Sequence, residues 1–142
     1  MNVAKILENK GNTVVTVSAA AEVSDAVELL NRHNIGALIA LDAKGKVAGI
    51  LSERDIVRRL RGSAATLLTQ PVSSIMTAKV VTCGRNDSVD EVMQIMTGRH
   101  FRHMPVVENG VLIGVVSIGD VVKTKIELTE GEAAALREYI AG

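Results

Sequence analysis

The sequence predicts an α/β protein built from two similar β-α-β-β-α units that pack together with pseudo-twofold symmetry. One observation is a repeat: GILSERDIV, residues 49–57, returns as GVVSIGDVV, residues 114–122, with glycine, serine and aspartate in the same places. Another is that each half alternates short apolar runs with apolar residues at helical spacing. A single unit of this kind cannot close a core alone, so we expect the two units to pack face to face.

In the first unit, the run TVVTV at 13–17 predicts a short strand. A helix is expected next, because four apolar residues follow at helical spacing: Val23, Ala26, Val27 and Leu30. The apolar runs GALIAL at 36–41 and VAGIL at 47–51 are separated by the turn sequence DAKGK, which predicts two neighbouring strands. The sequence ERDIVRRL, which begins at Glu53, predicts the closing helix.

The second unit repeats this order. Its strands are MPVV and VLIGVV, its closing helix is DVVKTKI, and its first helix is marked by Val89, Val92, Met93 and Met96. VAKIL at 3–7 resembles VSSIM at 72–76, so a lead-in segment is repeated as well. We therefore place the first repeat at 1–62, a surface linker at 63–74, the second repeat at 75–128 and a helical tail at 129–142.

Composition limits the classes of partner. The chain has 142 residues with 16 basic and 16 acidic side chains, and a net charge of zero creates no field that attracts nucleic acid or an anionic membrane. Phe101 and Tyr139 are the whole aromatic set, which leaves few stacking platforms for bases. The single cysteine, the polar first residues and the lack of a long apolar run predict a cytoplasmic protein that does not enter a membrane.

The repeated Ser-x-x-Asp has two interpretations. In one, the serine caps a helix and the aspartate completes a capping box, a use worth about 0.5–2 kcal/mol. In the other, the two side chains bind a ligand. A single copy of the motif favours capping, whereas the duplication and the accompanying threonines and glycines favour a ligand.

The chain resembles a tandem pair of CBS domains, the family named for its occurrence in cystathionine β-synthase. The resemblance rests on the two Gly-apolar-apolar-Ser-x-x-Asp motifs, the threonine of each first strand and the strand HMPVV at 103–107. It implies a regulatory protein, not an enzyme, that binds AMP, ADP, ATP or NAD(H) between its repeats, with S-adenosylmethionine ranked after these. It also implies a homodimer that signals to a regulated protein by a change in shape.

The chemistry of the motif agrees with this resemblance. A helix that begins near Ser52 directs backbone N–H groups towards the cleft, where they can bind phosphate oxygens. Asp55 lies in the first helical turn, and its carboxylate can accept both hydroxyls of a ribose. We therefore expect the serine to contact phosphate and the aspartate to contact ribose.

The resemblance implies two clefts, each with its serine and aspartate from one repeat and its threonine and middle strand from the other. The first would contain Ser52, Arg54, Asp55, Thr82, Arg102 and His103, and the second Ser117, Asp120, Thr16, Gly36 and Ala37. The extra cationic and hydrogen-bonding groups all lie in the first set, so we expect it to hold the more highly charged part of a ligand. Ile39 stands where the second repeat has Pro105, so the middle strand of the first repeat departs from the family pattern and its geometry is left open.

Other interpretations are weaker. His100 and His103 lie three residues apart with no cysteine or carboxylate near them, so no metal site is predicted. Cys83 occupies a strand position and is expected to pack as an apolar residue. Two alternatives to a nucleotide sensor remain: a dimerisation module without a ligand, and an enzyme acting on nucleotides, for which the sequence offers no nucleophile with its base.

Overall fold

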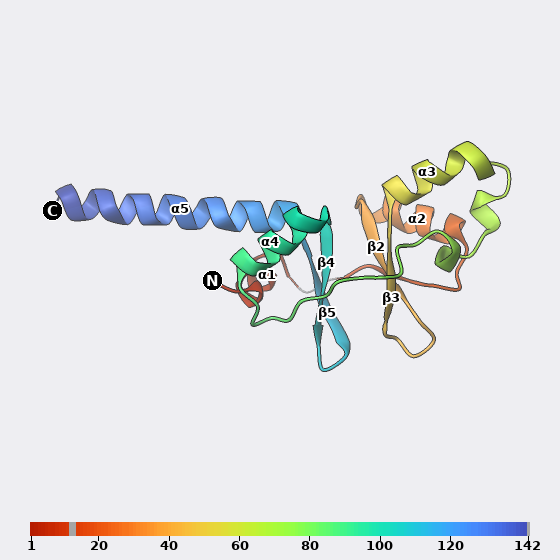
Figure 1. Cartoon of the computed structure of the whole chain (residues 1–142), viewed down its shortest axis with the longest axis horizontal. Helices are drawn as coiled ribbons and strands as arrows, with labels where there is room; N and C mark the ends of the chain where they lie inside the picture. Colours follow the sequence, from red (N-terminus) through yellow and green to blue (C-terminus); the bar gives the residue numbers. More distant parts are fainter. Residues whose placement is uncertain (12–13, 142) are drawn as a thin grey trace.

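The computed structural model describes residues 1–11 and 14–141, and its architecture is the predicted α/β arrangement of two repeats (Figure 1). The elements of the first half are α1 Val3–Lys10, β1 Thr16–Ser18, α2 Val23–His33, β2 Ala37–Leu41, β3 Val47–Ser52 and α3 Glu53–Ser63. Two 3₁₀ helices follow, η1 Leu67–Thr69 and η2 Val72–Ser74. The second half contains α4 Val89–Arg99, β4 His103–Glu108, β5 Val111–Ser117 and α5 Ile118–Ala141.

The two sheets differ in their first strand. In the first half β1 pairs in parallel with β2, and β2 pairs antiparallel with β3. The strand predicted at 13–17 forms at Thr16–Ser18 instead, and its first residue, Thr13, lies outside the described residues. In the second half only β4 and β5 form a described sheet, and the expected first strand is reduced to an isolated parallel bridge between Cys83 and Val106.

Proline explains why this strand does not extend towards its N-terminal side. The Cys83 N–H donates to the carbonyl of Pro105 at 3.0 Å, and the Val107 N–H donates to the carbonyl of Cys83 at 2.8 Å. The next bond of a parallel ladder would come from the N–H of residue 105, which proline lacks. At the equivalent position Ile39 has its N–H, and there the ladder extends over three residue pairs.

The two hydrophobic cores exchange their lead-in segments. Val3, Ile6 and Leu7 of α1 belong to the core of the second half, with Val89, Met96 and Val116 among its members. Conversely, Leu67, Val72 and Ile75 belong to the core of the first half. The expectation of a surface linker at 63–74 is therefore wrong for Leu67 and Val72, which are buried because they close the first core.

Glycine makes this exchange possible at two equivalent positions. A Cβ on Gly49 would lie 2.7 Å from Met76 Sδ and 2.7 Å from the Thr77 carbonyl oxygen. A Cβ on Gly114 would lie 2.6 Å from Leu7 Cδ2. Because they lack a Cβ, both glycines of the repeated motif allow a lead-in segment to pack closely against the strand.

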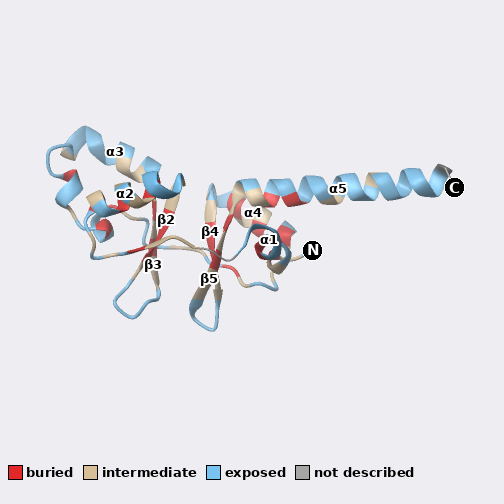
Figure 2. Cartoon of the chain, turned by 180° about the vertical axis from the view of Figure 1, so that it is seen from behind, coloured by how far each residue is buried: buried red, intermediate tan, exposed pale blue. Residues whose placement is uncertain are grey.

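Helix α5 is one continuous helix of 24 residues, so the predicted closing helix and the predicted helical tail are joined. Its first turns pack beside α4, whereas its C-terminal half projects along the long axis of the molecule, away from both repeats (Figure 1). The burial pattern agrees, because buried residues gather along the strands and the first turns of α5 while the rest of that helix is mostly exposed (Figure 2).

Candidate functional site

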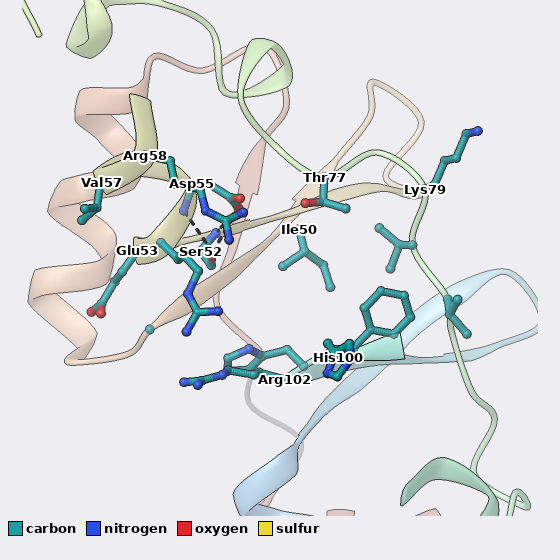
Figure 3. A pocket seen from close by; sticks show the side chains of 16 residues that line it. Ile50, Ser52, Glu53, Asp55, Val57, Arg58, Thr77, Lys79, His100 and Arg102 are labelled. Atoms are coloured by element: carbon teal, nitrogen blue, oxygen red, sulfur yellow. Dashed lines mark hydrogen bonds between the residues drawn. The ribbon is translucent and has the colours of Figure 1, made fainter. Parts of the chain in front are cut away.

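An open cavity of about 600 Å³ lies between the two repeats. One side is formed by the end of β3 and the start of α3, a second by the segment that leads into the second repeat, and a third by the start of β4 (Figure 3). The residues that line it are Gly36, Ile50, Ser52, Glu53, Arg54, Asp55, Val57, Arg58, Thr77, Lys79, Val80, Val81, His100, Phe101, Arg102 and His103. The cavity therefore contains side chains from both halves.

The wall at α3 is organised by a capping box. Asp55 Oδ2 accepts from the Ser52 N–H at 2.9 Å and from the Ser52 hydroxyl at 3.0 Å, and the Asp55 N–H lies 3.3 Å from Ser52 Oγ. The capping interpretation of the motif is therefore confirmed. Among the described residues, the partners of this carboxylate all bind Oδ2, which leaves Oδ1 available.

The opposite wall begins where α4 ends. His100 caps this helix in the left-handed conformation, with φ of 61°, and its N–H donates to the Met96 carbonyl. That turn directs the chain from the helix into β4, so that His100 and Arg102 both line the cavity (Figure 3). Arg102 is exposed and His103 is half-buried.

His103 has an unusual electrostatic environment. Burial, together with the positive charges of Lys10 and Arg102, lowers the pKa of its imidazole, and the nearby Asp120 only partly opposes this. An imidazole with a lowered pKa is neutral at pH 7. His103 therefore offers a hydrogen bond to the cavity, and the guanidinium of Arg102 offers the charge.

The third wall is held by a short backbone bridge. Ile50 and Thr77 exchange two hydrogen bonds, of 3.0 and 2.9 Å, which fix the segment that follows η2 against the edge of β3. This bridge positions Thr77 and Lys79 at the cavity. The sequence analysis did not select Lys79, although it occupies the same place after VSSIM as Lys10 does after VAKIL.

The structure brings together most of the residues predicted for the first cleft. Five of the six line the cavity: Ser52, Arg54, Asp55, Arg102 and His103. Thr82 does not line it, although Val81 does. Gly36, which was predicted for the second cleft, lines this cavity because it immediately precedes β2 and its carbonyl accepts the Glu53 N–H at the start of α3.

The aspartate predicted for the second cleft already has a cationic partner. Lys10 Nζ lies 2.7 Å from Asp120 Oδ2 and donates to the Val115 carbonyl at 2.9 Å. Burial acts to raise the pKa of Asp120, but Lys10 and the hydrogen bonds from Ser117 outweigh it, so the pKa is lowered. Of the other predicted residues, Thr16 begins β1 and Ala37 begins β2, and Ala37 faces Ser52 in the sheet register.

Three further predictions concern single features. Cys83 is buried, and burial raises the pKa of its thiol to about 12, as expected of a packing residue. Within residues 1–11 and 14–141, no three His, Cys, Asp or Glu side chains gather as metal ligands do. None of the helices in the same ranges combines the length and the apolarity needed to span a membrane.

Comparisons with known proteins agree with the geometry. The signature of the CBS domain family matches residues 11–62 and 72–127. A mitochondrial CBS domain-containing protein of Arabidopsis thaliana is 36% identical over 124 residues, which cover 84% of this chain and 60% of the relative. This chain thus spans less than two thirds of that relative's length.

Solved structures extend the comparison. The crystal structure of a CBS-domain containing protein from Agrobacterium tumefaciens has a TM-score of 0.82 and 48% identity, covering 87% of this chain and 92% of that one. The crystal structure of a CBS domain pair in complex with 5′-methylthioadenosine and S-adenosyl-L-methionine has a TM-score of 0.76 and 28% identity, covering 93% of this chain and 98% of the other.

Proposed function

The chain belongs to the CBS domain family and carries two copies of that domain, and on this premise we propose that it is a regulatory module that binds an adenine nucleotide between its repeats. The observation that carries the proposal is the cavity in which Ser52 and Asp55 of one repeat face Arg102 and His103 of the other. Its volume of about 600 Å³ lies within the range of small-molecule sites. The proposal contains no catalytic step.

The adenosine part of the ligand is supported by the second carboxylate oxygen of Asp55. Capping uses Oδ2, so Oδ1 can accept a ribose hydroxyl without loss of the helix cap. The related CBS domain pair described above contains two adenosine compounds in its crystal structure, which supports the same class of ligand for this chain.

A phosphate group is supported by the charges of the lining residues. Four cationic side chains line the cavity, Arg54, Arg58, Lys79 and Arg102, against the two carboxylates of Glu53 and Asp55. The first N–H groups of α3 add the positive end of a helix. AMP, ADP, ATP and NAD(H) therefore suit this cavity better than S-adenosylmethionine, which has no phosphate and carries a positive charge at sulfur.

The second cleft is proposed to bind more weakly. Asp120, the equivalent of Asp55, is bound by Lys10, so a ribose at that position has to compete with an ion pair already formed. Its middle strand begins with Ala37, and neither Ala37 nor the preceding Gly36 has a side-chain donor for a phosphate. We therefore propose one principal nucleotide per chain, with the regulated partner responding to its presence through the placement of the two repeats.

Calorimetric titration of AMP, ADP, ATP, NAD, NADH and S-adenosylmethionine tests this function. We expect a phosphorylated adenine ligand to bind, and Asp55→Ala to weaken it about tenfold or more, since a hydrogen bond to a charged group is worth about 1.5–3 kcal/mol. Asp120→Ala is the matched control, because it removes the equivalent aspartate from the second cleft. Failure of every adenine ligand to bind, or equal affinity in wild type and Asp55→Ala, would contradict the proposal.

A further inference from the structure

The exposed side of α5 carries a regular stripe that is apolar except for Thr129. From Val122 onwards its members follow one another in alternating steps of four and three residues: Val122, Ile126, Thr129, Ala133, Leu136 and Ile140. This is the spacing of the a and d positions of a coiled coil, and it keeps these side chains on one side of the helix over about 27 Å. We refer to these six residues as the α5 stripe.

The α5 stripe points away from the core of its own chain. The same helix buries Val121 and Thr124 against the second repeat, and these residues lie on a different side of α5. By contrast, Leu136 is 59% exposed and Ile140 is 74% exposed. The C-terminal half of the helix projects beyond the repeats, so a partner can approach that half from any side (Figures 1 and 2).

The charged residues that flank the α5 stripe indicate which partner covers it. The a positions are Ile126, Ala133 and Ile140, and the d positions are Val122, Thr129 and Leu136. Lys125 and Glu132 immediately precede the first two a residues, and Glu130 and Arg137 immediately follow the last two d residues. In a parallel coiled coil in register, the residue before an a position lies near the residue after a d position of the second helix. Lys125 then faces the partner's Glu130, and Glu132 faces the partner's Arg137, so both contacts join opposite charges.

An antiparallel pair with the same overlap has the opposite outcome. Each of Glu130 and Glu132 then lies opposite itself in the second helix, and Lys123 approaches the partner's Arg137. Like charges in these positions oppose pairing. Lys125 Nζ also lies 2.9 Å from Asp90 of its own chain, but an ammonium has three donors and can serve both carboxylates.

We propose that the α5 stripe is an interface on which a second copy of this chain docks, with the two α5 helices parallel and in register. This proposal does not depend on the nucleotide proposed above. It assigns the projecting half of α5 a role in assembly. A second copy of the same chain supplies both a matching stripe and the opposite charges beside it.

Two adjacent alanines provide a matched test in the full chain. Ala133→Glu places a carboxylate within the α5 stripe, whereas Ala134→Glu places the same group on the other side of the same turn. Sedimentation velocity over the micromolar range is expected to show a dimer for wild type and for Ala134→Glu, and a monomer for Ala133→Glu at the same concentrations. A monomeric wild type, or a dimer that Ala133→Glu leaves intact, would overturn the proposal.

Charge exchange and crosslinking test the direction of the helices. Glu132→Arg should weaken the dimer, and adding Arg137→Glu should restore it, because the pair is then re-formed with exchanged signs. Leu136→Cys should form an interchain disulfide on mild oxidation, since a parallel register brings the two residues 136 together. Cys83 should not compete, because it is buried and its thiol pKa is about 12. A double variant no better than Glu132→Arg, or no disulfide in a dimeric Leu136→Cys, would refute the parallel register.

Discussion

Replacing Gly49 with alanine tests how the repeats are joined. The added Cβ would lie 2.7 Å from the Thr77 carbonyl oxygen, a distance that real Cβ atoms essentially never show. That oxygen accepts the Ile50 N–H at 3.0 Å, so it cannot retreat without opening the bridge that holds Thr77 and Lys79 at the cavity. The equivalent Cβ on Gly114 meets the end of the Leu7 side chain, which can move more easily.

The expected magnitude follows from these contacts. Overpacking destabilises by about 1–3 kcal/mol, and loss of the bridge adds about 1 kcal/mol for each hydrogen bond. Alanine also restricts the unfolded chain more than glycine does, which stabilises the folded state by about 0.4–1 kcal/mol. We therefore expect Gly49→Ala to lower the free energy of unfolding by about 1–4 kcal/mol, and Gly114→Ala to lower it less. Gly62→Ala, at an open position in α3, should be neutral or stabilising by up to about 1 kcal/mol.

Urea unfolding followed by far-ultraviolet circular dichroism measures all three variants, and it suits a chain without tryptophan. The comparison is internal, because Gly49 and Gly114 occupy the same place in the two repeats. A Gly49→Ala protein as stable as wild type, or a larger loss in Gly114→Ala, would show that the backbone contact does not control this packing.

Three further outcomes are expected. Arg102→Ala should weaken AMP severalfold in calorimetry while adenosine barely changes, and equal losses for both ligands would exclude a phosphate contact. The lowered pKa of His103 should appear as a ring titration below 6.5 in NMR, and a titration above 6.5 would contradict this. Because the histidine of the unfolded chain then binds its proton at a higher pH than that of the folded chain, the free energy of unfolding should fall as the pH drops from 6.5. Lys10→Met should destabilise the protein by up to about 1 kcal/mol at pH 7, with the difference from wild type shrinking as the pH falls below 3.8 and the wild-type Asp120 becomes protonated. It should also free Asp120 for a second nucleotide; an unchanged stoichiometry would show that Lys10 does not limit that cleft.

Repetition in the sequence was sufficient to predict the two units, and one of the two interpretations of the Ser-x-x-Asp motif predicted the cap that begins α3. Hydrophobic spacing identified the helices, and a serine three residues before an aspartate specified the capping box because both groups act within one helical turn. Five of six residues predicted for the first cleft line one cavity, since the strand ends that carry them meet where the repeats face each other. Their roles towards a ligand remain predictions.

Other features depend on contacts that spacing alone does not encode. The apolar residues of α1 predict burial, but the sequence does not say that they enter the core of the opposite repeat. Lys10 and Lys79 occupy equivalent positions, yet one pairs with Asp120 and the other lines the cavity, because a long side chain takes its partner from the tertiary structure. Pro105 could have been interpreted correctly, since its missing N–H removes one ladder bond from the first strand of the second repeat.

The hydrogen bonds at the strand ends suggest how a ligand in the first cleft can be sensed outside it. The Ile118 N–H, at the start of α5, donates to the Arg102 carbonyl at 2.9 Å, so the backbone of a cavity residue is bonded directly to the helix that carries the α5 stripe. The Glu53 N–H makes the equivalent bond to the Gly36 carbonyl at the start of α3. A ligand can shift the arrangement of α3 and α5 only by as much as its affinity differs between two placements of the repeats. Ser52 and Arg102 approach the cavity from different repeats, so a ligand that contacts both would bind with an affinity that depends on how the repeats are placed.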